Sequence, residues 1–396
     1  MRILHVIRTL NPGWGGQVEG VRNLSQAGQR RGHYVEVACL DAATEPWLSS
    51  WTNPVHALGR VRGTFGYSPM LDQWLAAHIR EYDVVVVEGI WMYFSYSVWK
   101  ASKRFGVPYY LFIHGALDPW FKRRYPLKHI KKILYWKLFE RKVVRDAKAV
   151  LFTAEEEMLL AHNAFRPYEC KPIVVGYGIV PPYPKSLIGN SAARRELALR
   201  SPELRNRRFI LFLARIHEKK GIDLLLKAFA RCRGALPNMA LVITGGGDPK
   251  LTVSLKRLAS WLGISDDVVW TGPLYENAKL HAINAADAYI LPSHQENFGI
   301  SVVEALAFGT PVLISDKVNI WREIDAAGAG LIEPDTVEGT ARLLQRWLSL
   351  SEADKLRMRM AARECFTNNF DVSVTSARFF DVLQASSKGT TQAKSA

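Results

Sequence analysis

Two glutamates that are eight positions apart, Glu296 and Glu304, enclose a segment suited to hold a phosphate and a sugar. Gly299 in this segment allows the backbone to approach a ligand closely, and a helix that begins near Ile300 points its free N–H groups at the same space. Diphosphate oxygens suit these N–H groups, and carboxylates accept hydrogen bonds from hydroxyl groups. The spacing predicts that Glu296 lies beside a sugar and that Glu304, about one turn inside the helix, faces a ribose.

The same two acids have an ordinary interpretation as solvated charges on a loop and an amphipathic helix. For two isolated acids, that interpretation is the more common one. The complete segment reads ENFGISVVE, with Phe298 directly before Gly299, and this fuller pattern favours a binding site.

A second segment, LFLARIHEKKGID at positions 211–223, runs from an apolar stretch into a helical pattern. Arg215 and Lys220 emerge at the ligand-facing edge, where a guanidinium fork and an ammonium group can neutralise a leaving diphosphate. Fixed cations stabilise such charge more in the transition state than in the ground state. Taken alone, an arginine and a lysine in a basic protein are usually plain surface charges.

Two features of the N-terminal half are candidates for the same chemistry. Gly15 and Gly16 follow the first apolar run and open a helical pattern, so their N–H groups can face a phosphate, although such loops are also ordinary tight turns. His114 follows the apolar run at 109–113 and lies at the carboxyl end of an expected strand. A lone histidine is more often structural than catalytic, but this location favours a site residue.

Two positions of the C-terminal half lie in turns that follow expected strands. Gly245 opens a Gly-Gly-Gly turn after the apolar run at 240–244, and a purely conformational role is as plausible there as a ligand contact. Leu274 follows the run at 268–271.

These candidates fall at the ends of apolar runs that alternate with helical patterns, which predicts an α/β protein. The expected strands lie at 2–7, 34–40, 84–87, 109–113, 150–152, 209–213, 240–244, 268–271, 288–291 and 311–314. The alternation predicts two Rossmann-like, doubly wound parallel-sheet domains that face each other across a cleft.

The chain length of 396 residues also favours two domains. Because prolines at 181, 182 and 184 interrupt the alternation, we expect the interdomain connection there. The expected organisation is an N-terminal domain, a linker, a C-terminal domain, a helix that returns to the N-terminal domain, and a disordered tail rich in Ser, Thr, Lys and Ala. Their bounds are 1–178, 179–207, 208–370, 371–386 and 387–396.

Composition limits the compartment and the partners. The four cysteines are scattered without a CxxC pair, which fits a reducing compartment, and the N-terminal MRILHVI is too short for a signal-peptide core. No apolar window is long enough to span a bilayer, so we expect a cytoplasmic protein whose membrane contact is peripheral. The net charge of +15 indicates attraction to phosphate without choosing between nucleic acid, anionic lipid and nucleotide.

The 120–148 segment combines a strong positive charge with an apolar stripe. It contains eleven Lys or Arg residues against Glu140 and Asp146. The stripe at helical spacing consists of Leu127, Ile130, Leu134 and Leu138. Such a helix suits an anionic membrane surface. The alternative is that the stripe packs on the sheet of the N-terminal domain and the charges are solvated, and both can hold together.

The 296–304 segment resembles the Glu-x7-Glu signature of the family 4 retaining glycosyltransferases, which have the GT-B fold, and the resemblance extends over nearly the whole chain. It implies that Arg215 and Lys220 bind the diphosphate of a nucleotide-sugar donor. It also implies that His114 contacts the transferred sugar.

The resemblance extends to the glycine turns. The loop at Gly15 and Gly16 is similar to the family's loop that faces the donor phosphates and the acceptor. Gly245 resembles a Gly-x-Gly turn of the family, and Leu274 lies in the segment whose backbone contacts the nucleobase.

The resemblance implies a retaining glycosyltransferase that moves a hexose-type sugar from a UDP- or GDP-sugar to a glycan or lipid-linked acceptor. Bacterial cell-surface polysaccharide biosynthesis at the inner face of the cytoplasmic membrane is the expected context. No cofactor and no metal are expected, because Arg215 and Lys220 supply the charge that a divalent ion would provide and no Asp-x-Asp motif is positioned for one.

Two rival functions remain open at this stage. Another GT-B enzyme, such as a nucleotide-sugar 2-epimerase, would share the fold and the diphosphate site. A basic protein that binds membranes or nucleic acid through the 120–148 segment is the rival of a different class, but it leaves the spacing of Glu296 and Glu304 unexplained. We expect no specific nucleic-acid partner.

Overall fold

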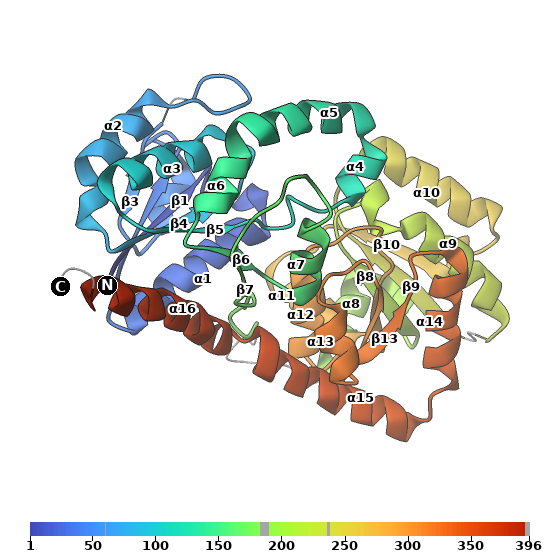
Figure 1. The fold of residues 1–396 in the computed structure, drawn as a ribbon. Helices are drawn as coiled ribbons and strands as arrows, with labels where there is room; N and C mark the ends of the chain where they lie inside the picture. Colours follow the sequence, from blue (N-terminus) through green and yellow to red (C-terminus); the bar gives the residue numbers. More distant parts are fainter. Residues whose placement is uncertain (60, 183–189, 236–237, 393–396) are drawn as a thin grey trace. The chain divides into compact units, whose positions relative to one another are not determined.

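A computed structural model of the chain describes residues 1–59, 61–182, 190–235 and 238–392 (Figure 1). The chain divides into two compact units. Unit 1 consists of Met1–Val180 together with Val372–Ala396, and unit 2 consists of Pro181–Asp371. Each unit is built around one parallel sheet, so the predicted α/β class with two parallel-sheet domains is confirmed.

Unit 1 contains a seven-stranded parallel sheet with the order β3-β2-β1-β4-β5-β6-β7. Its strands are β1 (Arg2–Ile7), β2 (Tyr34–Cys39), β3 (Val55–Ala57), β4 (Val84–Glu88), β5 (Tyr109–Phe112), β6 (Ala149–Phe152) and β7 (Pro172–Val174). The central strands are apolar runs because helices cover both faces of a parallel sheet. All five residues of β4, VVVVE, are buried.

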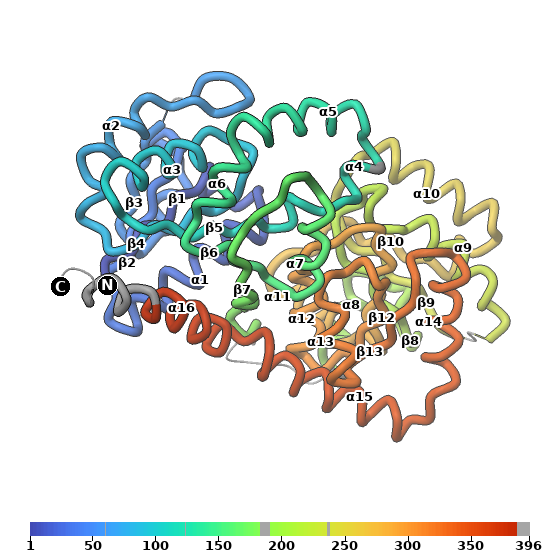
Figure 2. The backbone as a smooth tube through the Cα atoms, viewed as in Figure 1, coloured from blue at the N-terminus to red at the C-terminus, as the bar shows by residue number. Residues whose placement is uncertain are grey.

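The helices of unit 1 are α1 (Gly16–Arg30), α2 (Pro69–His78), α3 (Tyr93–Phe105), α4 (Trp120–Arg124), α5 (Pro126–Tyr135), α6 (Arg141–Asp146), α7 (Glu155–Ala161) and α16 (Val372–Gln392). Side chains alternate across the sheet, so neighbouring residues of one strand enter different cores. Val85 packs with Leu71 of α2 and Phe94 of α3, whereas Val84 packs with Leu24 of α1 and Phe379 of α16. The chain therefore returns to unit 1 at its C-terminal end, where α16 lies beside α1 (Figure 2).

Unit 2 contains a six-stranded parallel sheet with the order β10-β9-β8-β11-β12-β13. Its strands are β8 (Arg208–Leu213), β9 (Met239–Thr244), β10 (Val268–Gly272), β11 (Ala288–Leu291), β12 (Val312–Ser315) and β13 (Gly330–Glu333). Its helices are α8 (Asn190–Arg200), α9 (Ile222–Cys232), α10 (Pro249–Trp261), α11 (Glu276–Ala285), α12 (Ile300–Ala307), α13 (Trp321–Ala326), α14 (Val337–Ser349) and α15 (Glu352–Cys365).

In both sheets the strand order reverses beside the first strand of the unit. β1 lies between β2 and β4, and β8 lies between β9 and β11. The loops that follow the two strands at such a reversal diverge to opposite faces, which opens the usual ligand site of a doubly wound sheet. The fold thus directs attention to the loops after β1 and β4 in unit 1 and after β8 and β11 in unit 2.

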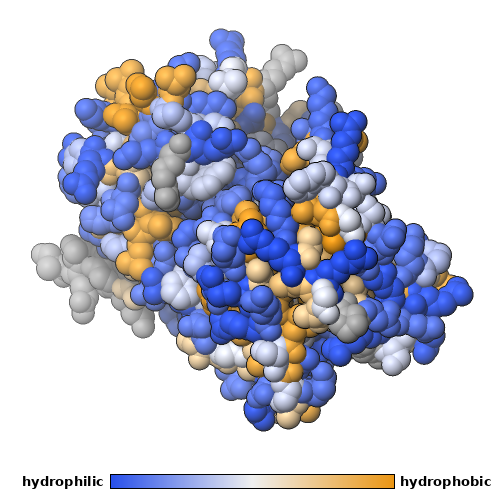
Figure 3. All heavy atoms as spheres, turned by 90° about the vertical axis from the view of Figure 1, so that its right-hand side faces the viewer, coloured by the Kyte–Doolittle hydropathy of each residue, from blue (hydrophilic) through white to orange (hydrophobic). Residues whose placement is uncertain are grey.

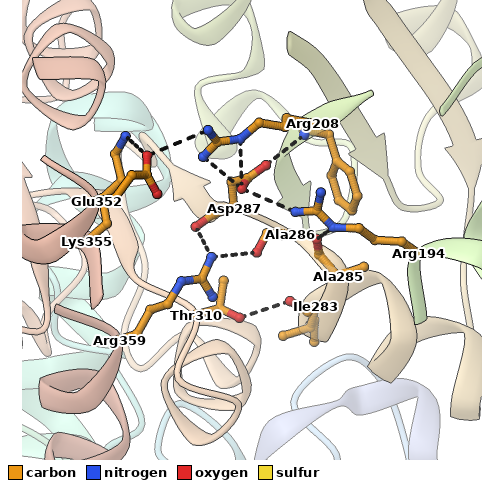
Figure 4. Close-up of polar contacts among 11 residues, drawn as sticks. Arg194, Arg208, Ile283, Ala285, Ala286, Asp287, Thr310, Glu352, Lys355 and Arg359 are labelled. Atoms are coloured by element: carbon orange, nitrogen blue, oxygen red, sulfur yellow. Dashed lines mark hydrogen bonds and ion pairs between the residues drawn. The ribbon is translucent and has the colours of Figure 1, made fainter. Parts of the chain in front are cut away.

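A buried carboxylate joins four segments of unit 2 (Figure 4). Asp287, at the start of β11, accepts hydrogen bonds from Arg194 of α8, from Arg208 of β8 and from the Phe209 backbone N–H. Arg359 of α15 donates to the Asp287 carbonyl oxygen at 2.9 Å. Three guanidinium groups are therefore held in place by one aspartate and its backbone, which is a structural use of positive charge.

The element boundaries differ from the sequence expectations in a few places. The short strands β3, β7 and β13 were not expected. The expected linker at 179–207 contains α8, which the Arg194–Asp287 ion pair joins to unit 2; residues 183–189 lie outside the described residues. Helix α16 continues to Gln392, whereas the expected helix ended at 386 and a disordered tail followed; residues 393–396 are likewise outside the description.

The apolar stripe of the 120–148 segment does not pack on the sheet of unit 1, which corrects one of the two interpretations. Leu127, Ile130, Leu134 and Leu138 are between 51% and 79% exposed. The segment is anchored instead by Trp136, whose ring stacks on Phe165 with 5.1 Å between centroids. Because the anchor lies at the end of α5, the helix itself keeps its apolar residues in solvent.

None of the helices in the described part of the chain is long and apolar enough to cross a membrane. On the face that Figure 3 shows, hydrophilic side chains dominate and apolar atoms form separate patches among them. The four cysteine thiols are free.

Candidate active site

In unit 2, the first element of the candidate site is the loop after β8. A short 3-10 turn, Glu218–Lys220, precedes Gly221, which is the N-cap of α9 and has a φ of 65°. A side chain on Gly221 would place its Cβ 2.1 Å from the Pro292 carbonyl oxygen. Only glycine fits this close approach, so the absence of a side chain at position 221 allows Lys220 to lie against the segment after β11.

Two further contacts join the same two loops. The His294 backbone N–H donates to the Lys219 carbonyl oxygen at 2.7 Å. The Lys219 ammonium group donates to the Gln295 side-chain oxygen at 3.0 Å. The loops after β8 and β11 therefore form one structure, even though about 70 residues separate them in sequence.

This arrangement brings Lys220 and Glu296 together in an ion pair. The Lys220 side chain is 9% exposed and that of Glu296 is 21% exposed, so water screens the pair only partly. The backbone of Glu296 is fixed on both sides, because its N–H donates to the Lys317 carbonyl and its carbonyl accepts from the Asn319 N–H. A cation and a carboxylate are thus held at one place by rigid backbone.

The N-terminus of α12 lies next to this ion pair in the chain. Gly299 precedes the helix with a φ of 77°, and its carbonyl accepts from the N–H groups of Val302 and Val303. The helix begins at Ile300, as the sequence predicts. Ser301 shares a hydrogen bond of 2.6 Å with the Tyr289 hydroxyl, which also donates to the carbonyl of Leu213 at the end of β8.

Arg215 is exposed and makes no ion pair within the residues that the structure describes. Its loop depends on Gly245, because a Cβ at that position would lie 1.9 Å from the Ala214 carbonyl oxygen. The Ile216 N–H then donates to the Gly246 carbonyl at 2.8 Å. Gly245 therefore has a conformational role in supporting the loop that carries Arg215.

Glu304 is nearly buried on α12 and pairs with Lys279 of α11 at 2.5 Å. Its side chain is 10% exposed, so the helix presents little of this acid to solvent. Phe298 is buried, and its ring meets Phe370 edge-on with 5.8 Å between centroids. Leu274 lies half-buried in the turn after β10.

In unit 1, the glycine loop follows β1 at the strand reversal. Gly15 has a φ of 78° and caps the first turn of α1, which begins at Gly16. The Tyr177 hydroxyl donates to the Gly16 carbonyl, and the Tyr177 ring meets the His114 ring edge-on with 6.0 Å between centroids. Tyr177 thus connects the two features of unit 1 that the sequence singled out.

A buried carboxylate holds His114. Glu88, the last residue of β4, contacts His114 Nε2 and His5 Nδ1, each at 2.8 Å. Burial alone would raise the pKa of Glu88, but the hydrogen bonds from His114 and His5 outweigh it and keep that pKa below its usual value. An ionised carboxylate can only accept, so Nε2 of His114 and Nδ1 of His5 both donate to it. The carboxylate thereby fixes the orientation of the His114 ring.

The backbone at this edge of unit 1 is strained. His114 has a φ of 51° and Trp91, three residues after Glu88, has a φ of 73°. Non-glycine residues in this region cost energy and persist where the surroundings hold them, often at functional sites. Here the Trp91 N–H donates to Glu140 at 3.0 Å and its indole N–H donates to the Ala116 carbonyl at 3.1 Å.

The structure therefore gathers the predicted residues into two groups, one in each unit. Unit 2 brings Lys220, Glu296, Gly299 and Ile300 into adjoining loops, with Arg215 on the β8 loop. Unit 1 joins Gly16 to His114 through Tyr177.

Sequence reasoning missed several residues of these groups, namely Glu88, His5, Tyr177, Lys279 and Tyr289. An acid at the carboxyl end of the run VVVVE was a visible signal for Glu88. His5, Tyr177 and Lys279 lie 25 or more residues from the residues that they contact, and Tyr289 lies in the strand before the 296–304 segment without a signal of its own. Among the described residues, no group of three or more His, Cys, Asp or Glu side chains is arranged to hold a metal ion.

The unit 2 arrangement can bind an anion and a polyol together. Lys220, the exposed Arg215 and the first N–H groups of α12 attract phosphate oxygens, and Glu296 accepts hydrogen bonds from hydroxyl groups. An anionic ligand would compete with Glu296 for the Lys220 ammonium group.

Two family models match parts of the chain. Residues 194–364 match the family Glycosyl transferases group 1, and residues 15–178 match the Glycosyl transferase 4-like domain. The chain is 33% identical over 184 residues to a phosphatidyl-myo-inositol mannosyltransferase of Mycolicibacterium smegmatis, which covers 46% of each chain. It is 29% identical over 259 residues to a D-inositol 3-phosphate glycosyltransferase of Streptomyces avermitilis, covering 62% of this chain and 54% of that protein.

The chain spans about half the length of these relatives. The crystal structure of Anabaena HepE in complex with UDP and glucose superimposes with a TM-score of 0.76 at 17% identity. That comparison covers 97% of this chain and 100% of HepE, so the likeness in fold extends over both units.

We predict that Gly221→Ala destabilises unit 2 more than Gly263→Ala. Both glycines have similar φ values, 65° and 68°, so both alanines carry the left-handed backbone cost of about 1–2 kcal/mol. Only the alanine at 221 meets a carbonyl oxygen, because a Cβ at 263 has nothing within 4 Å. Forced overpacking of this kind costs about 1–3 kcal/mol more.

Urea unfolding of the two variants and the wild type measures this difference. Equal losses of unfolding free energy would mean that the Gly221–Pro292 contact does not hold the two loops together.

Proposed function

We propose that this chain, which belongs to the group 1 glycosyl transferases and has the GT-B fold, moves a hexose-type sugar from a UDP- or GDP-sugar to a glycan or lipid-linked acceptor. The donor binds at the loops of unit 2. Transfer retains the anomeric configuration, as in the family that the 296–304 signature resembles. The context that we propose is bacterial cell-surface polysaccharide biosynthesis in the cytoplasm.

The observation that carries this proposal is the Lys220–Glu296 pair at the strand reversal of unit 2. When a nucleoside diphosphate leaves, negative charge develops on its oxygens, and a positioned ammonium group stabilises that charge without reorganisation. Lys220 and Arg215 are the cations available there. Glu296, released from Lys220 by the incoming diphosphate, accepts hydrogen bonds from hydroxyl groups of the sugar.

We further propose that the reaction needs no divalent metal. The fixed cations of unit 2 and the N–H groups of α12 take the role that a metal plays in neutralising the leaving group. Transfer measured with and without EDTA addresses this point, and a loss of transfer that Mg²⁺ or Mn²⁺ restores would contradict it.

The rival within the same fold is a nucleotide-sugar 2-epimerase. An epimerase converts the donor into an isomeric nucleotide sugar and needs no acceptor, whereas a transferase releases nucleoside diphosphate in proportion to the glycosylated product. Following UDP or GDP release across a panel of donors, with and without lipid-linked acceptors, therefore separates the two.

We expect Lys220→Met to lower kcat/KM for transfer by about a hundredfold or more, because one preorganised donor to a developing anion is worth that much. Glu296→Gln should lower it by a comparable factor while nucleoside diphosphate still binds, since the neutral amide no longer forms an ion pair with Lys220. The matched control is Lys227→Met, which removes a half-buried lysine of α9 that pairs with Asp223 outside the site.

Coupled detection of nucleoside diphosphate gives the rates, and calorimetry gives the affinity for UDP and GDP. Unchanged kcat/KM in the Lys220 variant would contradict the proposed site.

Glu88 is a positioning residue in this proposal, because it orients His114 without facing the ligand itself. We expect Glu88→Gln to lower kcat by about tenfold or more with little change in KM for the donor, since an amide no longer selects the tautomer of His114. The control is Glu36→Gln, which changes another buried carboxylate of unit 1 that contacts a histidine, His56, away from the site.

Both variants are compared by kcat, KM and unfolding midpoint. A fall in kcat that the Glu36 variant shares to the same extent would indicate a general loss of folding and would remove Glu88 from the mechanism.

We also propose that α5 binds an anionic membrane surface. Four apolar side chains of the 120–148 segment are exposed, and lysines flank them. Exposed apolar residues between cations are the features of a helix that lies in a lipid interface.

The variant Ile130→Asn with Leu134→Asn should weaken binding to vesicles containing phosphatidylglycerol by about tenfold or more, because each buried CH₂ contributes ~0.8 kcal/mol. Leu356→Asn with Met360→Asn is the matched control, since these two residues have the same spacing on α15 and are also more than half exposed. Vesicle co-sedimentation measures the difference, and equal binding of both double variants would refute a role for α5.

A further inference from the structure

A pocket of unit 1 opens beside α4 and α5 and is assigned to no ligand by the features described so far. The pocket is open to solvent, and the space within it together with the solvent at its mouth is about 440 Å³. The lining residues are Ala116, Asp118, Pro119, Phe121, Lys122, Tyr125, Lys128, His129, Lys132, Ala164 and Phe165. The lining therefore combines several cationic or titratable groups with aromatic and small apolar side chains.

The charge of the pocket is positive and poorly compensated. Lys122, Lys128 and Lys132 line it, and Asp118 is the single acid in the lining. The three lysines form no ion pair within the part of the chain that the structure describes. Instead, the Lys128 ammonium group lies 4.9 Å from the centroid of Tyr125 and that of Lys132 lies 4.6 Å from the centroid of Trp91.

Lys132 is the most enclosed of these cations. Burial lowers its pKa, and the nearby Glu140 carboxyl group opposes that effect only in part. Aromatic faces attract a cation but compensate its lost hydration weakly, by about 0.5–2 kcal/mol. An anion in the pocket would supply the missing partner.

Part of the pocket lining is apolar. Phe121 and Phe165 line the pocket together with Ala116 and Ala164. These residues are neighbours of the cations, because the Lys132 ammonium group lies 5.6 Å from the centroid of Phe121 and the His129 ring packs on Phe165 with 4.8 Å between centroids. A ligand that fits both kinds of residue carries an anionic group joined directly to an apolar group.

The position of the pocket relates it to the site of unit 1. Ala116 follows His114 by two residues, and two peptide units span at most about 7.6 Å between Cα atoms. The Trp91 indole N–H holds the Ala116 carbonyl at 3.1 Å, and the Gly115 N–H donates to Glu157 at 2.5 Å. The loop between His114 and the pocket is thus fixed at both ends.

We propose that this pocket binds a phosphate ester of an apolar chain and that the ester belongs to the acceptor of the reaction. The identification of the ester as part of the acceptor rests on the proposed function, whereas the binding of the ester rests on the pocket alone. The phosphate contacts Lys122, Lys128 and Lys132, and the first carbons of the chain contact Phe121 and Phe165. The hydroxyl that receives the sugar then lies on the side of His114.

The test is calorimetric titration of the full chain with octyl phosphate below its micelle concentration. Inorganic phosphate and 1-octanol are titrated separately, because each carries one half of the proposed ligand. We expect octyl phosphate to bind at least about tenfold more tightly than either, since the pocket contacts both halves.

Lys132→Met should weaken octyl phosphate binding by roughly tenfold, because it removes a charge-assisted hydrogen bond while keeping the length of the side chain. Lys131→Met is the matched control, since Lys131 directly precedes Lys132 in α5 but does not line the pocket. It should change the affinity by less than about twofold. Lys128→Met, which changes an exposed lysine of the lining, provides a second variant that does not depend on the packing of Lys132.

Three results would overturn the proposal. Equal weakening by Lys131→Met and Lys132→Met would mean that octyl phosphate senses only the general charge of α5. Inorganic phosphate binding as tightly as octyl phosphate would mean that Phe121 and Phe165 do not contribute to recognition. Absence of saturable octyl phosphate binding by the wild-type chain would remove the site altogether.

The experiment also separates this inference from the proposed function. Glu296→Gln, which should stop transfer, is expected to bind octyl phosphate with the wild-type affinity, because Glu296 belongs to unit 2. Lys132-dependent binding in a chain that transfers no sugar would refute the function and leave the pocket in place. Sugar transfer by a chain whose octyl phosphate binding does not depend on Lys132 would refute the pocket and leave the proposed function in place.

Discussion

The ion pair between Lys220 and Glu296 is the contact on which the site of unit 2 depends. It exists because β8 and β11 are neighbours at the strand reversal, so that two loops far apart in sequence leave the sheet side by side. Gly221 permits the close approach, and the Lys219 and His294 backbone contact fixes it. The carboxylate holds a nearly buried ammonium group in position. In the proposed function, the anionic group of the ligand takes the place of that carboxylate.

In unit 1, the buried charge that organises the candidate site is a carboxylate. Glu88 is fully buried, and two histidine N–H groups compensate it. A buried carboxylate with charged or polar partners on both sides holds its neighbours more rigidly than a surface acid, because leaving any partner unpaired is costly. The strained backbone of His114 is the local cost of that orientation.

The sequence predicts most of the two sheets because their strands are apolar on both faces. The run at 84–87 is an example, since four valines in succession suit only a strand that is covered on both sides. β3 and β7 are edge strands of three partly exposed residues each, and β13 is a short edge strand, so none carries a comparable signal.

The site was predictable where a motif is local and not where it is assembled by the fold. Glu296, Gly299 and Ile300 lie within five residues of each other, and the structure begins α12 where the pattern predicts it. Lys279 reaches this helix from α11, and Tyr289 of β11 also contacts the Leu213 carbonyl of β8, 76 residues away in sequence. Such contacts depend on how the helices pack and on strand order, which periodicity alone does not specify.

The arginines and lysines of this chain have different roles in different places, and the net charge does not distinguish these roles. Arg194, Arg208 and Arg359 are bound by Asp287 and nearby carbonyls, so they hold unit 2 together and are not available to a ligand. Lys122 and Lys132, in contrast, line a pocket and form no ion pair within the described residues. A cation whose partner is an aromatic ring is only partly compensated, and an anion can displace that contact at little cost. The two proposals of a phosphate site, at the β8 loop of unit 2 and at the α4–α5 pocket of unit 1, therefore rest on the local partners of these lysines and not on the net charge.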